Sequence, residues 1–183
     1  AASQLAKAHQ ATCRIVVGDA LNHEGFPGVY QVGQAAAQAP RLVEIDWCGD
    51  ADGPSLTLVG KGVCFDTGGL DIKTAAGMLT MKKDMGGGAH ALGLAKKIML
   101  AKLPIRLKVL VPAVENSIAG NAYRPSDILT MRDGTTVEVT NTDAEGRLVM
   151  ADVLHYACEQ SPDLLIDFAT LTGAARVALG TEI

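Results

Sequence analysis

The chain contains 183 residues, of which 48% are hydrophobic and 20% are charged. A chain of this length fits a single domain, and its hydrophobic residues are sufficient to form a buried core. Disorder is therefore excluded for most of the sequence. The formal net charge is −4, and no apolar run approaches the ~18 residues of a membrane span. Neither nucleic acid nor a membrane is therefore an expected partner. The few cysteines are widely separated, which argues against a disulfide framework and favours a cytoplasmic location: Cys13, Cys48, Cys64 and Cys158.

Helix and strand patterns alternate along the chain. A helical pattern opens the sequence before a strand at 14–17. Apolar runs or alternation predict further strands at residues 41–47, 55–63, 106–114 and 164–169. Helical periodicity predicts helices at 86–102 and 148–159, and Asp133-Gly134 predicts a hairpin at 128–139. This alternation indicates an α/β fold with a mostly parallel, mixed sheet flanked by helices. Neither end resembles a natural terminus, so we expect a sequence cut at both ends.

Two polar segments follow predicted strands, where α/β sheets bind their ligands. The first lies in an irregular, glycine-containing stretch and supplies Lys61, Asp66, Asp71, Lys73 and Asp84. The second is NTDAEGRL, which supplies Asp143, Glu145 and Arg147 at spacings of two. In an extended stretch this spacing would direct all three side chains toward one side.

Several carboxylates cannot converge in a partly buried place without a cation, because like charges disfavour ionisation. Oxygen-rich sites suit Mg²⁺, Mn²⁺ or carboxylate-bound Zn²⁺, and a pair of such ions can activate water and polarise a carbonyl. A nearby lysine or arginine would stabilise the developing oxyanion. Any one of these carboxylates alone is more often a solvated loop residue. Taken together, the residues are compatible with a metal hydrolase or a phosphoryl-transfer site.

The sequence resembles a known family over nearly its whole length. The runs VGKGVCFDTGGLDIK, MLTMKKDMGGGA, NTDAEGRL and DFATLTGAA are similar to those of the leucyl aminopeptidase family, peptidase family M17. NTDAEGRL is the signature octapeptide of that family. The resemblance implies that residues 1–183 form the N-terminal portion of the catalytic domain. The macro-like N-terminal domain of the family and the end of its catalytic domain would then be absent from this chain.

The resemblance also implies the roles of particular residues. One divalent ion would be held by Lys61, Asp66, Asp84 and Glu145, and the other by Asp66, Asp143 and Glu145. The metals would be Mn²⁺ or Zn²⁺, with Mg²⁺ or Co²⁺ also possible. Lys73 would polarise the scissile carbonyl, and Arg147 would anchor a bicarbonate that acts as general base. The side-chain pocket for a Leu-type substrate would include Met81, Thr170, Leu171 and Gly173.

The resemblance therefore implies a two-metal aminopeptidase that removes N-terminal residues from short peptides, in a protein that assembles as a homo-hexamer. The alternatives are a non-catalytic DNA-binding accessory protein, as some members of the family are, and a structural subunit. The net charge of −4 disfavours the first, and the intact set of polar motif residues disfavours the second.

Two features near the motifs have simpler interpretations. GGGAHALG, at residues 86–93, half-resembles a dinucleotide fingerprint, but no buried strand precedes it. Its small residues more plausibly let a helix start pack closely. Cys64 adjoins the predicted site and is expected to be an inert buried thiol.

Overall fold

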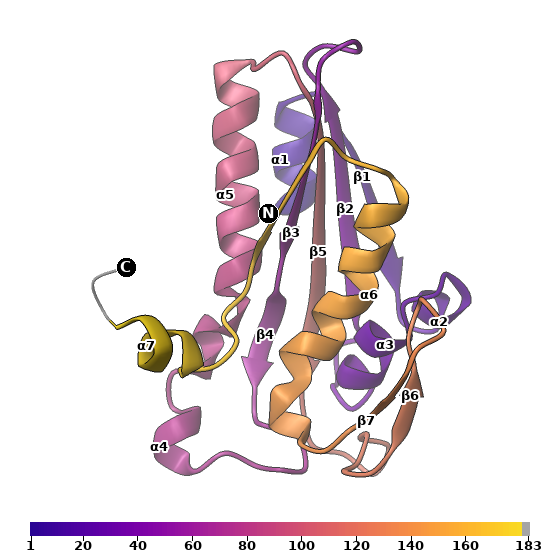
Figure 1. Ribbon diagram of the computed structural model, residues 1–183, viewed down its shortest axis with the longest axis vertical. Coiled ribbons are helices and arrows are strands. Elements are labelled where there is room, and N and C mark those ends of the chain that lie inside the picture. Colours follow the sequence, from indigo (N-terminus) through magenta and orange to yellow (C-terminus); the bar gives the residue numbers. More distant parts are fainter. Residues whose placement is uncertain (181–183) are drawn as a thin grey trace.

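A six-stranded mixed sheet forms the centre of the molecule (Figure 1). The structure is a computed structural model that describes residues 1–180. Strand β5 (Arg106–Asn116) is the centre of the sheet, and β3 (Ser55–Gly60), β4 (Gly62–Asp66) and β8 (Leu164–Phe168) run parallel to it. On the other side of β5, β2 (Arg41–Cys48) runs antiparallel to β5, and the edge strand β1 (Thr12–Val17) runs antiparallel to β2. The expected α/β class with a mostly parallel, mixed sheet is confirmed. The expectation about the end of the chain at 181–183 lies outside the described residues.

Helices cover both faces of this sheet (Figure 1). Helices α1 (Ala2–Ala8) and α5 (Gly86–Ala101) pack over one face, where alternate strand residues such as Leu58 and Val109 are fully buried. The opposite face carries α3 (Pro27–Gly33) and α6 (Glu145–Glu159) over residues such as Val59 and Leu110. Neighbouring residues of one strand thus enter different cores, which explains why the parallel strands are continuous apolar runs.

The remaining elements are short. They are α2 (Ala20–His23), α4 (Ala75–Met78), the 3₁₀ helices η1 (Met81–Met85) and η2 (Thr142–Ala144), the hairpin strands β6 (Ile128–Thr130) and β7 (Thr136–Glu138), and α7 (Ala174–Leu179). The hairpin and the helix predicted at 86–102 are confirmed. None of the described helices combines the length and hydropathy that crossing a bilayer requires.

The strand predicted at 55–63 is wrong in one respect, because it is interrupted at Lys61 and continues as β4. The Lys61 backbone N–H donates to the Phe168 carbonyl at 2.9 Å, and its carbonyl accepts from Gly88 N–H at 2.7 Å. The start of α5 approaches β8 so closely that a Cβ at Gly87 would lie 2.1 Å from the Phe168 oxygen. The glycine run therefore permits close packing, as expected, and satisfies the backbone at the interruption.

The second polar segment is not extended, which corrects the expectation based on its spacing of two. Thr142–Ala144 form η2, and α6 begins already at Glu145 instead of at residue 148. The Asn141 side chain accepts from the Asp143 N–H at 2.8 Å and so starts the turn. A local hydrogen bond of this kind competes with strand formation, which is why simple alternation fails here.

Cys64 is exposed, so the expectation of a buried thiol is wrong. The pairing register between β4 and β5 shifts between Val63 and Phe65. Such a bulge interrupts the alternation of side chains along a strand. The apolar neighbours of Cys64 therefore do not predict its burial.

Candidate metal centre

The predicted charged residues meet at the carboxyl ends of the parallel strands. Asp66 is the last residue of β4, and Lys61 lies at the break between β3 and β4. Asp84 comes from η1, while Glu145 opens α6. Because the parallel strands end at one edge of the sheet, segments far apart in sequence deliver these side chains to one place.

Lys61 connects two buried carboxylates. Its Nζ lies 2.9 Å from Oδ2 of Asp84 and 2.7 Å from Oε1 of Glu145, and it donates to the Thr170 carbonyl at 2.7 Å. All three charged side chains are buried. A Cβ at Gly146 would lie 2.7 Å from Cε of Lys61, so a larger residue there would require this lysine to shift. The two carboxylate oxygens are within ion-pair distance of Nζ but accept no hydrogen bond of acceptable geometry.

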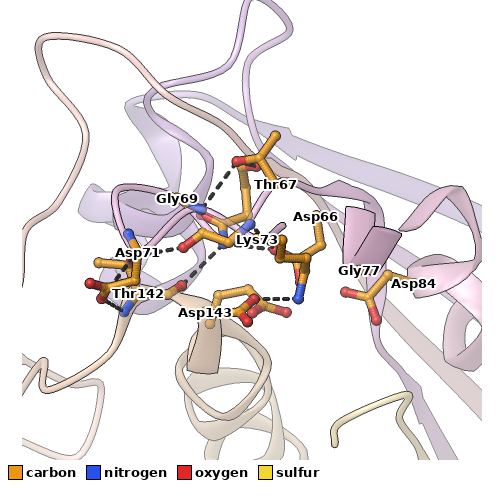
Figure 2. Close-up of polar contacts among 12 residues, drawn as sticks. Asp66, Thr67, Gly69, Asp71, Lys73, Gly77, Asp84, Thr142 and Asp143 are labelled. Carbon is orange, nitrogen blue, oxygen red and sulfur yellow. Dashed lines mark hydrogen bonds and ion pairs between the residues drawn. The ribbon is translucent and has the colours of Figure 1, made fainter. Parts of the chain in front are cut away.

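Lys73 connects the other two carboxylates, as Figure 2 shows. Its Nζ lies 3.0 Å from Oδ2 of Asp66 and donates to Oδ1 of Asp143. Asp66, Asp143 and Glu145 each offer a carboxylate oxygen, and these atoms lie within 4.8 Å of one another. Three acidic groups at this spacing are a suitable oxygen donor set for a divalent cation.

The electrostatics of the centre indicate that its buried carboxylates lack sufficient positive counter-charge. Burial raises the pKa of Glu145 to about 7 and also raises the pKa of Asp143. Burial alone would lower the pKa of Lys73, but hydrogen bonds to Asp143 and Asp66 outweigh it, so this pKa is raised. Lys73 is thus held charged while Asp143 and Glu145 resist ionisation. A divalent cation would relieve this imbalance, because it favours the ionised form of every carboxylate around it.

A hollow of about 270 Å³ opens beside these groups. It is lined by the exposed Arg147 together with Lys61, Asp143, Ala144, Glu145, Gly146, Leu171 and Thr172. Thr170 lies behind it and donates from Oγ1 to Oδ1 of Asp84 at 2.7 Å. The half-buried Met81 and the exposed Gly173 do not line the hollow. The structure therefore brings Arg147 and Leu171 to the charged residues, but not the whole predicted pocket.

A second hollow, of about 520 Å³, is larger but contains none of the predicted residues. It lies at the opposite ends of β3 and β5 and includes Trp47, Thr57 and Arg106. The first hollow is lined by the buried Lys61 and Glu145 and the second by none of the converging charged residues, so we assign the candidate site to the first.

Sequence reasoning missed two buried residues that support the centre, Asn116 and Tyr123. Asn116 contacts Asp66, and both residues contact Thr142. They lie outside the quoted motifs, and the only available signal was a polar residue just after the apolar run at 106–114. Asp71, from the first polar segment, accepts from the Thr142 N–H at 2.7 Å and therefore supports the centre.

Comparisons with known proteins agree with this geometry. The profile described as cytosol aminopeptidase family, catalytic domain, matches residues 1–183. A probable cytosol aminopeptidase from Xylella fastidiosa is 49% identical over 170 residues, which are 93% of this chain and 35% of that protein. The chain thus spans about a third of the length of this curated relative.

Solved structures share the fold. The crystal structure of a cytosol aminopeptidase from Coxiella burnetii superposes with a TM-score of 0.93 at 56% identity, covering 98% of this chain and 39% of that one. The bottromycin maturation enzyme BotP, in complex with Mn, gives a TM-score of 0.90 at 41% identity, covering 98% and 40%. On fold, motifs and sequence together, the chain belongs to the cytosol aminopeptidase family, and its match is to the catalytic domain of that family.

Proposed function

We propose that this chain is part of a metal-dependent aminopeptidase that hydrolyses N-terminal residues, with a Leu-type preference, from short peptides. The observation that carries the proposal is the convergence of buried carboxylates around two lysines. Oxygens of Asp84 and Glu145 are buried there without a hydrogen bond. Oδ2 of Asp84 and Oε1 of Glu145 have only the poorly oriented Lys61 ammonium as a partner, at 2.9 and 2.7 Å, so they are available to a divalent cation.

The donor set fits two divalent ions. Lys61, Asp66, Asp84 and Glu145 would hold one of them. The other would be held by Asp66 and Glu145, which bridge, and by Asp143 through its side chain and backbone carbonyl. Lys61 can act as a ligand only as a neutral amine, and its burial beside a divalent cation would favour that form. Mn²⁺ or Zn²⁺ suits this mixed oxygen and nitrogen set, and the BotP complex with Mn supports the former.

Two ions held in this way would activate water and polarise the scissile carbonyl, as is already known for two-metal aminopeptidases. Lys73 is held charged by its carboxylate neighbours and reaches into the centre from its own loop. We assign it the stabilisation of the oxyanion that develops on the substrate. The exposed Arg147 guanidinium at the hollow would bind a bicarbonate that accepts the proton.

The hollow would receive the first side chain of the substrate. Leu171 supplies an apolar wall of the hollow. Thr170, Met81 and Gly173, which do not line it, stay predicted pocket residues on the motif resemblance alone. A substrate with a free α-amino group can add a ligand to the metal pair, whereas an internal peptide bond cannot. This difference would restrict the enzyme to N-terminal residues.

The family assignment carries three broader proposals. The chain would form the N-terminal portion of the catalytic domain, within a protein that assembles as a homo-hexamer. That protein would act in the cytoplasm, which the names of the relatives support. The DNA-binding alternative has no support in this chain, whose net charge of −4 opposes it.

Hydrolysis of leucyl-p-nitroanilide by the natural protein that contains this chain tests the proposal. We expect turnover that chelation abolishes and that Mn²⁺ or Zn²⁺ restores. N-acetyl-leucyl-p-nitroanilide, which lacks the free amine, is the matched control and should not react. Turnover that survives exhaustive chelation, or equal turnover of both substrates, would contradict the proposed function.

A further inference from the structure

Asn116 joins the two segments that supply the carboxylates. It ends β5, and its side chain is fully buried, with 0% exposure. Its Nδ2 donates to Oδ1 of Asp66 at 2.8 Å and to the Thr142 carbonyl at 3.1 Å. One amide hydrogen thus binds the segment of Asp66, and the other binds the segment of Thr142. Oδ1 of Asp66 is held in place, and Oδ2 is the oxygen that faces Lys73 at 3.0 Å.

Tyr123 reaches the same carbonyl from a neighbouring loop. Its hydroxyl is buried and donates to the Thr142 oxygen at 2.7 Å. Burial raises the pKa of this phenol well above its usual range, so it remains a donor at any physiological pH. Two side-chain donors therefore converge on one backbone carbonyl, directly before Asp143.

Thr142 is tied to the first segment by further bonds, several of which are visible in Figure 2. Its Oγ1 donates to the Gly68 carbonyl at 2.6 Å and accepts from the Asp71 N–H at 2.8 Å. Its N–H donates to Oδ2 of Asp71 at 2.7 Å. Small movements of Thr142 would therefore displace Asp143 relative to Asp66.

The network is tightly packed against Gly69. Oδ1 of Asn116 is buried without a hydrogen-bond partner. Gly69 has φ +66°, and a Cβ there would lie 3.0 Å from this Oδ1 and 3.0 Å from Oγ1 of Thr142. A buried amide oxygen without a hydrogen-bond partner costs free energy, which indicates that the two hydrogen bonds from the amide nitrogen are important to this site. A neutral donor also orients a carboxylate without adding a charge that competes with a cation.

We propose that Asn116 and Tyr123 are positioning residues of the metal centre. Asn116 holds Asp66 so that one oxygen stays directed at the ions, and the two residues together hold the Thr142 carbonyl and thereby the place of Asp143. This inference rests on the proposed function, because it takes Asp66 and Asp143 to be ligands. Neither Asn116 nor Tyr123 touches the substrate or the ions in this scheme.

The test measures the Mn²⁺ dissociation constant of the metal-stripped natural protein by equilibrium dialysis. Asn116→Asp and Asn116→Ala remove the two donors, and we expect both to weaken Mn²⁺ binding about 10- to 100-fold. Tyr123→Phe removes one donor without touching Asp66, and we expect about threefold to tenfold weaker binding. The matched control is Asn121→Ala, which removes an exposed amide that donates to the Gln34 carbonyl at 2.9 Å. Its dissociation constant should stay within about twofold of wild type.

Urea unfolding of the metal-free variants separates positioning from general stability. If Asn116 were only structural, its variants would unfold at lower urea but, while folded, bind Mn²⁺ with wild-type affinity, and that result overturns the inference. If neither Asn116 variant folds, Tyr123→Phe decides, and wild-type affinity of that variant overturns the inference. Failure of the wild-type protein to bind Mn²⁺ refutes instead the proposed function on which the inference rests.

Discussion

The polar clusters at the two ends of α6 differ in how completely their charged groups are paired. Near its last turn, the Arg132 guanidinium lies 4.8 Å from the centroids of both Phe26 and Tyr156. It donates two hydrogen bonds of 2.9 Å to Glu159 and two more to the backbone carbonyls at 24–25. Each charged oxygen of Glu159 has a donor. The Arg132 cluster is thus complete as the chain stands.

At the first turn of α6, the charged groups of the candidate metal centre are less completely paired. The pKa of Glu145 is raised. One buried oxygen of Glu145 and one of Asp84 lie within ion-pair distance of the Lys61 Nζ but accept no well-oriented hydrogen bond. A polar cluster that serves the fold satisfies its members, whereas one that serves a ligand leaves positions for it. The comparison predicts that substitutions in the Arg132 cluster change stability alone and that substitutions in the centre change metal binding and catalysis.

The largest effect is expected for Glu145→Gln. The amide keeps the shape of a bridging ligand but removes its charge, so Mn²⁺ affinity should fall by at least about 100-fold, beyond what an outer-shell change produces. The metal-free protein should lose little stability, because a carboxyl with a pKa of about 7 is already partly neutral at neutral pH. Metal analysis and thermal unfolding of the stripped protein check both statements. Unchanged metal content would remove Glu145 from the ligand set.

Lys73→Met should separate catalysis from metal binding within the centre. Loss of the positive charge at the substrate oxyanion should lower kcat by about 10²–10³-fold. Metal content should be preserved, because Lys73 competes with cations for Asp66 and Asp143 and is not itself a ligand. Steady-state kinetics with leucyl-p-nitroanilide, alongside metal analysis, measure the two quantities. A change confined to KM would contradict the proposed role.

Arg132→Met tests the other side of the comparison. Removal of the stacked and hydrogen-bonded guanidinium should lower the free energy of unfolding by about 2–4 kcal/mol. The folded variant should bind Mn²⁺ as wild type does. Urea titration gives the stability, and Arg124→Met, which removes an exposed arginine, is the control with an expected change within about 0.5 kcal/mol. Loss of metal affinity in folded Arg132→Met would end the distinction between the two clusters.

The smallest expected effect is a pH dependence. Hydrogen bonds from Arg132 lower the pKa of Glu159 below its usual range. A lowered pKa contributes stability that is present above the unfolded-state value of about 4.3 and is lost as pH falls through the folded-state value. The stability difference between wild type and Glu159→Gln should therefore be seen at pH 7 and shrink below about pH 4. A difference that grows on acidification would contradict the assigned ion pair.

Local patterns predicted much of this fold. A continuous apolar run located β5 because a strand buried on both faces needs apolar residues throughout. The run at β8 located that strand too, but β8 is an edge strand whose residues are exposed or half-buried. The break at Lys61 escaped prediction because apolar strand residues continue on both sides of it, beyond the adjacent glycines. Its backbone partners, Phe168 and Gly88, are distant in sequence. Such pairing is a tertiary property that no local pattern encodes.

The candidate site was predictable to a different degree. The charged residues stood out because they interrupt an apolar chain, and the motif resemblance supplied their roles. Asn116 and Tyr123 did not stand out, since an amide and a phenol are common in loops and gain significance only from their partners. The turn at Thr142–Ala144 was missed because the Asn141 cap outweighs the strand-like spacing.

Helix α6 joins the two clusters. It has 15 residues, which at 1.5 Å per residue is about 22 Å of continuous hydrogen-bonded backbone between Glu145 and Glu159. A fluctuation that detaches the whole helix from the sheet must dismantle both clusters, so cation binding at one end raises the free energy of that opening for every residue of the helix. Backbone amides beside Tyr156 would then exchange their hydrogens with solvent more slowly once Mn²⁺ is bound at the far end, although nothing moves between them.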